Sequence, residues 1–404
     1  MSTSLLYHTF GVRGYRHVGT RYEGGRTVFR IDQDPGTLRC PECRSRNVIR
    51  RGCTVREFRT VPVGSRPVVL VLPVQRVECR SCGAIRQVKV AFAEERRTYT
   101  RAFERYALDL SRAATIQDVA WHLGISWDVI KDIQKRSLTR RFGKPKLHKL
   151  SLIAMDEISI GRGQRYLTVV LDLRSGAVVF VAEGREAKVL DPFWRSLRQA
   201  RARVQAVAMD MWPAYITAVQ THLPGVPIVF DHFHVVKLFN EKLSDLRRDL
   251  QREATERLHK QVLKGTRWLL LKNPENLDES RHERTRLEEA LRVNRPLATA
   301  YYLKEDLRQF WDQADKPTAA SFLQDWIARA TVSGIRMLQD FAKTLAAHRS
   351  GLLAYYDHPI STGPLEGTNT KIRVLQRRSY GFRDMEFFKL KIKALHETKY
   401  ALVG

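Results

Sequence analysis

The chain has 404 residues, enough for about two to four domains of ordinary size. It carries 70 Lys and Arg residues against 43 Asp and Glu residues, a formal net charge of +27, and 43% of its residues are hydrophobic. This apolar content excludes disorder as the main state. Because no run reaches the ~18 apolar residues of a membrane span and no signal peptide is evident, we expect a soluble, cytoplasmic protein. The charge favours a polyanionic partner, nucleic acid before a membrane surface.

Four of the five cysteines form two C-x2-C pairs, Cys40 with Cys43 and Cys79 with Cys82. Each pair puts two thiolates on one side of a tight turn, and two such turns complete the tetrahedral site of one structural zinc ion. Two disulfides are the alternative, which a reducing cytoplasm disfavours. The apolar residues between the pairs predict strands, and the remaining Cys53 is expected to be a small buried residue.

The segment after the cysteines has the pattern of a helix-turn-helix. Thr115 caps a first helix, Gly124 allows a tight turn, and Ser126 caps a second helix. The second helix would lie in the major groove of DNA, with Trp127 and Lys131 facing outward.

A basic run follows the second helix. Seven Lys or Arg residues and no acid lie between Lys135 and Lys149. Such a run is often only a solvated linker, but directly after a recognition helix we favour contact with DNA phosphates. This interpretation assigns DNA contacts to Arg140, Arg141 and Lys144.

From residue 150 the pattern predicts alternating strands and helices. Strands are expected over residues 151–157, 166–173, 177–182, 204–210 and 227–231, and helices over 190–201 and 212–222. The order β-β-β-α-β-α-β fits the ribonuclease H-like fold, in which the first and fourth strands are neighbours. Asp156 and Asp210, at the ends of those two strands, are therefore expected to share a metal site. Glu157 should point to the opposite face of the sheet, and Asp172 should close a turn.

Helical patterning continues from Val236 to about Asp357, where Trp268, Trp311 and Trp326 are expected in a buried core rather than stacked on bases.

A second informative helix begins near Pro364, where Glu366 precedes a series of basic residues. One acid at the head of a basic helix makes sense if the acid holds a cation and the bases hold DNA phosphates. We therefore expect DNA contacts from the polar and basic residues of this helix, Asn369, Lys371, Arg373, Arg377 and Arg378.

At this point the chain resembles the ISL-three family of insertion-sequence transposases, a DDE group. The resemblance covers residues 38 to 398, and four stretches carry it: Ala154–Glu157, Val207–Tyr215, Val229–Lys237, and Gly363–Asn369 continuing to Arg378–Phe382. It implies that Asp156, Asp210 and Glu366 form the catalytic triad. It also implies a helical insertion before the glutamate helix. Asp231 and His234 fall in the third stretch and are candidates for supporting the triad, for positioning DNA, or for a structural role.

The family's chemistry requires two Mg²⁺ or Mn²⁺ ions about 3.5–4 Å apart, held by the three acids. Water frees a 3′-OH at the end of the element, and this 3′-OH attacks target DNA. The expected partners are double-stranded DNA, both terminal inverted repeats and target, and a second copy of the chain; the expected place of action is the bacterial nucleoid. A catalytically inactive, domesticated DNA-binding regulator is an alternative, and so is a hydrolytic nuclease or junction resolvase on the same fold.

The expected fold class is a multidomain α+β protein. We expect a zinc-ribbon DNA-binding domain, a helix-turn-helix domain with its basic linker, a ribonuclease H-like catalytic core, an all-helical insertion, and the C-terminal part of the core with the glutamate helix. In chain order these cover residues 1–95, 96–149, 150–240, 241–357 and 358–404.

Overall fold

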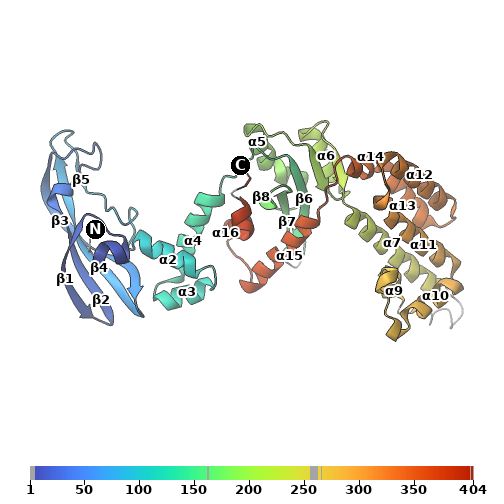
Figure 1. The fold of residues 1–404 in the computed structure, drawn as a ribbon, viewed down its shortest axis with the longest axis horizontal. Helices are drawn as coiled ribbons and strands as arrows, with labels where there is room; N and C mark the ends of the chain where they lie inside the picture. The colour runs from blue at the N-terminus through green and yellow to red at the C-terminus, as the bar shows by residue number, and fades with distance from the viewer. Residues whose placement is uncertain (1–4, 162, 255–262, 265, 401, 404) are drawn as a thin grey trace. The chain divides into compact units, whose positions relative to one another are not determined.

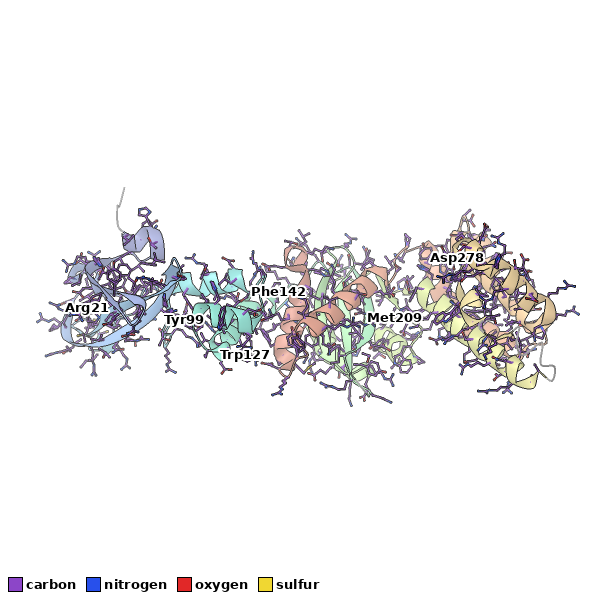
Figure 2. All side chains as sticks on the ribbon, turned by 90° about the horizontal axis from the view of Figure 1, so that it is seen from below. Arg21, Tyr99, Trp127, Phe142, Met209 and Asp278 are labelled. Atoms are coloured by element: carbon purple, nitrogen blue, oxygen red, sulfur yellow. The ribbon has the colours of Figure 1, made fainter. Side chains whose placement is uncertain are left out.

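The computed structural model describes residues 5–161, 163–254, 263–264, 266–400 and 402–403. The chain forms two compact units, Met1–Arg141 and Phe142–Gly404. Their elements are shown in Figure 1, and Figure 2 adds the side chains. Within the described ranges no helix has the length and apolar character needed to cross a membrane.

The first unit begins with a five-stranded sheet in the order β1-β2-β4-β3, with β5 paired to β4. After the short helix α1 (Leu5–Phe10), its strands are β1 (Tyr15–Glu23), β2 (Arg26–Gln33), β3 (Val48–Val63), β4 (Arg66–Cys79) and β5 (Ile85–Gln87). The strands expected between the cysteine pairs are therefore confirmed as the long β3–β4 hairpin. The β1–β2 hairpin was not expected, because polar and basic residues such as Arg21, labelled in Figure 2, interrupt its apolar pattern.

The helix-turn-helix consists of α2 (Arg101–Leu110), α3 (Ile116–Leu123) and α4 (Trp127–Phe142). Thr115 caps α3 as expected, in a capping box with Asp118, and Gly124 adopts the left-handed conformation, φ +58°, that ends the helix. Half of the expected basic run is not a linker, since α4 continues through it to Phe142.

Strand β3 also contacts the helix-turn-helix. The Arg59 carbonyl accepts a hydrogen bond from the Thr100 amide at 2.8 Å, and the Arg59 guanidinium donates to the Leu123 carbonyl at the end of α3 at 2.7 Å. Arg56 donates to the Arg97 carbonyl at 2.9 Å. These contacts join the zinc-ribbon sheet and the three helices into one unit.

The second unit contains a sheet in the order β10-β9-β6-β7-β8. Its strands are β6 (Leu152–Ser159), β7 (Tyr166–Asp172), β8 (Ala177–Glu183), β9 (Ala206–Met209) and β10 (Ile228–Phe230). β6 pairs antiparallel with β7 and parallel with β9, so the expected neighbourhood of the first and fourth strands is confirmed. One expectation was wrong: β6 does not end at its acids but continues to Ser159, because β7 pairs with it over that whole length.

Helices cover both faces of this sheet (Figure 1). They are α5 (Asp191–Gln199) and α6 (Pro213–His222) on one face, and α15 (Gly363–Arg378) and α16 (Met385–Lys393) on the other, with α17 (Glu397–Tyr400) near the end of the chain. Along β6 the side chains alternate between the two cores: Ile153 and Met155 pack with α5 and α6, whereas Ala154 packs with α15.

The helical insertion lies between β10 and α15. It contains α7 (His232–Glu253), α9 (Arg267–Leu271), α10 (Glu283–Val293), α11 (Arg295–Arg308), α12 (Lys316–Val332), α13 (Arg336–Ala347) and α14 (Arg349–Leu353). Trp326 is buried as expected, and its indole N–H donates to the Leu303 carbonyl. The prediction that Trp268 is buried was wrong, since this residue is 65% exposed and its ring lies beside Arg267. Residues 255–262 of the expected helical stretch lie outside the described residues.

Candidate functional site

The four paired cysteines form one compact cluster. Cys40 Sγ lies 3.6 Å from Cys82 Sγ, Cys43 Sγ lies 3.5 Å from Cys79 Sγ, and all four sulfur atoms lie within 4.8 Å of one another. A tetrahedral zinc ion with bonds of about 2.3 Å puts its sulfur ligands about 3.8 Å apart. The cluster therefore fits zinc, and these separations are too long for disulfides of about 2.0 Å.

The two cysteine turns have the same backbone geometry. The amide after each pair donates to the first cysteine's carbonyl, from Arg44 to Cys40 and from Gly83 to Cys79. Both donors have positive φ, 61° and 71°. Cys53 lies outside the cluster and is exposed on β3, so the expectation of a buried residue was wrong.

Trp127, labelled in Figure 2, is the first residue of α4. Trp127 is 41% exposed, and Lys131 Nζ lies 5.3 Å from the centre of its ring. Arg140 is exposed and makes a 3.6 Å ion pair with the buried Glu104. Arg141 and Lys144 are exposed as well.

In the second unit, the sheet register brings Asp156 and Asp210 together. Ala154 on β6 pairs with Ala208 on β9, and each aspartate follows two residues later on its chain. Both carboxyl groups therefore lie on the face covered by α15. Each accepts a hydrogen bond from nearby backbone: Asp156 from the Glu157 amide at 2.8 Å, and Asp210 from the Trp212 amide at 3.2 Å.

Burial and mutual repulsion raise the pKa values of the acids here. Burial is the main cause for Asp156, whose pKa rises to about 6, and for Glu157, whose pKa rises to about 7; the pKa of Asp210 is raised for the same reason. The charges of His234 and Lys237 oppose the rise at both aspartates. Crowded, partly desolvated carboxylates with raised pKa values are stabilised by a cation, so the donor set fits Mg²⁺ or Mn²⁺.

Glu157 points to the opposite face, as expected. Its strand partner is Thr168, and Tyr215 of α6 hydrogen-bonds to both Glu157 and the Thr168 hydroxyl. Asp172 closes a turn, also as expected, by accepting from the Arg174 and Ser175 amides.

Glu366 lies in the first turn of α15, exposed, and its carboxylate has no side-chain partner among the described residues. One turn later, Asn369 is 4% exposed, and its amide donates to Asp156 Oδ2 at 2.8 Å. Residues three apart share one face of a helix, so this bond turns the Glu366 face toward the aspartates. The carboxylates of the three acids are not close enough together to bind one metal ion in common. Within the described ranges, the four cysteines are the group whose ligand atoms are that close.

The structure thus gives Asn369 a partner that sequence reasoning missed. It was expected to contact DNA, but its amide is bound to a candidate metal ligand across 213 residues of sequence. No local pattern indicates such a contact. The basic residues expected beside it, Lys371, Arg373, Arg377 and Arg378, are exposed on α15, with Lys371 Nζ 2.9 Å from His396 Nε2.

Asp231 and His234 have different surroundings. Asp231 is 2% exposed, and its Oδ1 accepts from the Thr362 amide at 3.2 Å, which fixes the start of α15 four residues before Glu366. His234 lies one turn before Lys237 on α7, and its charge acts on both aspartates. Asp231 thus supports the glutamate helix, whereas a positive charge on His234 would favour the ionised aspartates.

Replacing Asn369 with Ala is expected to slow metal-dependent DNA cleavage about 10- to 100-fold and to raise the Mg²⁺ concentration that gives half-maximal rate. Groups that orient a metal ligand typically have effects of this size. Thr370→Ala, at an exposed position of the same helix, is the matched control and should match the parent chain. Equal Mg²⁺ dependence in both variants would remove Asn369 from this role.

Stabilisation by Mn²⁺ is expected to increase with pH. Burial raises the pKa of Asp156 from the ordinary 3.8 to about 6, so ionising this group destabilises the metal-free fold as the pH rises toward 6. Bound Mn²⁺ requires the ionised Asp156 and offsets that loss. At one fixed Mn²⁺ concentration, the rise in Tm should be larger at pH 8 than at pH 5.5. A rise independent of pH would contradict the assignment.

Comparison with known proteins matches both units. The DDE transposase sequence model of family ISL3, described as "Transposase", matches residues 153–392. The "Helix-turn-helix domain of transposase family ISL3" matches residues 88–138, and the "zinc-finger of transposase IS204/IS1001/IS1096/IS1165" matches residues 37–82. A DDE site on a ribonuclease H-like sheet defines an enzyme that cleaves DNA and transfers its strands.

The chain belongs to the ISL3 family of transposases. It is 35% identical to the transposase for insertion sequence element IS1001 of Bordetella parapertussis over 98% of both chains. It is 31% identical to the transposase for element IS1557 of Mycobacterium tuberculosis, over 89% of this chain and 86% of that one. Among solved structures, the Drosophila P element transposase strand transfer complex matches with a TM-score of 0.43 and 12% identity, over 76% of this chain and 94% of that one.

Proposed function

We propose that the chain binds the terminal inverted repeats of its insertion sequence and inserts that element into target DNA, with Asp156, Asp210 and Glu366 as the catalytic triad. The pairing of β6 with β9 carries this proposal, because it sets the two aspartates side by side under the helix that holds Glu366. The three acids come from β6, the end of β9 and α15, and only the folded sheet brings these segments together.

The triad would hold two divalent cations, Mg²⁺ or Mn²⁺. When bound, these cations stabilise charge on the attacking and leaving oxygens and lower the pKa of the attacking water. The chain's own contribution is to fix the acids: Asn369 and the Glu157 amide orient Asp156, and Asp231 anchors the helix of Glu366. Lys237 places positive charge near the acids, where a DNA phosphate would enter.

The reaction proceeds in two substitutions at phosphorus. Water attacks the phosphodiester at the end of the element, the bond between phosphorus and the 3′ oxygen breaks, and a 3′-OH and a 5′-phosphate result. This 3′-OH then attacks a target phosphodiester and displaces the 3′ oxygen of the target strand, so this second step conserves the number of phosphodiester bonds. No covalent bond between protein and DNA is required, and no Ser or Tyr nucleophile is needed.

The first unit supplies recognition of the repeats. The zinc held by Cys40, Cys43, Cys79 and Cys82 stabilises the ribbon, and Trp127 and Lys131 of α4 lie on the candidate recognition surface. The further DNA contacts are assigned to the exposed basic residues Arg140, Arg141, Lys144, Lys371, Arg373, Arg377 and Arg378. Two copies of the chain would bridge two element ends, and the reaction would take place on DNA in the bacterial cytoplasm.

A strand-transfer assay tests the function directly. The full chain, Mg²⁺, a labelled duplex carrying the element end and a target plasmid are expected to yield joined donor–target molecules, and chelation by EDTA should prevent joining. Cleavage without joining would instead identify a nuclease or resolvase. End binding with neither cleavage nor joining would identify a DNA-binding regulator.

A further inference from the structure

One arginine beside the acids is held by two aromatic rings. The Arg185 guanidinium carbon lies 4.7 Å from the centre of the Tyr166 ring and 5.5 Å from the centre of the Trp212 ring. Its Nη2 also donates to Gln164 Oε1 at 3.4 Å. These residues come from the start of β7, the segment after β8 and the segment after β9, so only the folded sheet brings them together.

This cluster lies at the edge of the sheet where the candidate triad is found, with Tyr166 on the face to which Glu157 points. Trp212 follows Asp210 by two residues, and the Trp212 amide donates to the Asp210 carboxylate. The positive charge of Arg185 also acts on Glu157. Within the described part of the chain, however, no carboxylate lies within ion-pair distance of this guanidinium. Among the described residues, therefore, no ion pair neutralises the charge of Arg185 at the edge of this acidic site.

The aromatic contacts limit what Arg185 can bind. The guanidinium lies over both rings, so stacking already restrains the side chain. One of its five N–H groups donates to Gln164, and the others remain for a ligand, in a planar arrangement that matches the oxygens of a phosphate. A guanidinium restrained before binding loses less conformational entropy when it binds.

We propose that Arg185, braced by Tyr166 and Trp212, binds a backbone phosphate of the DNA strand that is cut, next to the scissile phosphodiester. The proposal rests on the proposed function, because it takes the strand at the acids to be the one cleaved. Arg185 would place that strand before the acids act on it, as a positioning residue.

The test replaces single phosphates with neutral methylphosphonates on each side of the scissile bond and measures single-turnover cleavage by the full chain. In the parent chain, one position should slow cleavage about tenfold, the usual size of a charge-assisted contact. Arg185→Gln should be about tenfold slower on unmodified DNA and show no further loss at that position. Arg174→Gln, an exposed arginine beyond the other end of β7, should keep the parent pattern.

Two results would overturn this assignment. One is a slowing of Arg185→Gln by the methylphosphonate at that position that equals the slowing of the parent chain. The other is an equal salt dependence of end binding in Arg185→Gln and the parent chain. Losing one phosphate contact should reduce the magnitude of the slope of log K against log salt by about 0.9. The binding measurement is made without Mg²⁺, so it reports on Arg185 even if the triad assignment fails. Trp212→Phe, which keeps an aromatic ring beside Arg185, should keep more of the position-dependent slowing by methylphosphonate than Trp212→Ala.

Discussion

Asp156→Asn is expected to reduce strand cleavage at least about a thousandfold and to leave binding of the element end within about twofold of the parent chain. The loss follows from removing a charged metal ligand, not from damage to the fold. The new side chain keeps an oxygen that can accept from the Glu157 amide. The buried Oδ1 of Asn369 has no partner among the described residues, so a flip of the Asn369 amide would let this oxygen accept from the new NH₂ group. The neighbours of Asp156 can therefore accept the substitution.

The same outcome is expected for Asp210→Asn and Glu366→Gln. Gel assays of cleavage with Mg²⁺, equilibrium binding to the end duplex and thermal unfolding would be measured on each variant. Glu241→Gln, which neutralises an exposed acid of α7, is the control and should cleave normally. Full cleavage by any one of the three variants would exclude that residue from the site.

Cys40→Ser is expected to lower the zinc content from one ion per chain to none and to weaken end binding more than tenfold. Cys40 is 1% exposed, and loss of one thiolate leaves three ligands in a cluster whose folding depends on the metal. Because β3 and β4 carry both the cysteine turns and the contacts to the helix-turn-helix, the effect should extend beyond the ribbon.

Cys53→Ser is the matched control for that experiment, since Cys53 is the exposed cysteine outside the cluster. It should retain zinc and parent binding. Metal analysis, thermal unfolding and binding to the end duplex measure the three quantities independently. Unchanged zinc content and binding in Cys40→Ser would show that the cluster does not support recognition.

The central sheet could be predicted because its strands are short, apolar and bounded by turns. The rules for connections between strands leave only a handful of neighbour orders, and the order of strands and helices along the chain fits that of the ribonuclease H-like fold. The hairpin of β1 and β2 was harder, although Gly24 and Gly25 mark its turn, since its strands carry too many polar residues to stand out. The alternation of apolar and polar residues along a strand is hard to recognise when many of its residues are basic, even if one face of the strand is buried.

The candidate acids could be found in the sequence, but the groups that orient them could not. Asn369 reaches Asp156 only because α15 packs on β6 through Leu365 and Ile372. Asp231 reaches Thr362 across 131 residues, a contact that spans the whole helical insertion. Arg185 meets its two rings for a similar reason. Such contacts depend on tertiary packing, and no spacing along the chain encodes them.

The continuity of β3 constrains how this DNA-binding unit can evolve. A single strand of 16 residues begins near the cysteine turns and carries Arg59, whose side chain holds the end of α3. Successive strand residues point to opposite faces, so one inserted residue between those points would swing Arg59 away from its carbonyl partner. Transposases that recognise new terminal repeats would therefore diverge by substitution of surface side chains. The length of β3 between the zinc ribbon and the helix-turn-helix would stay the same.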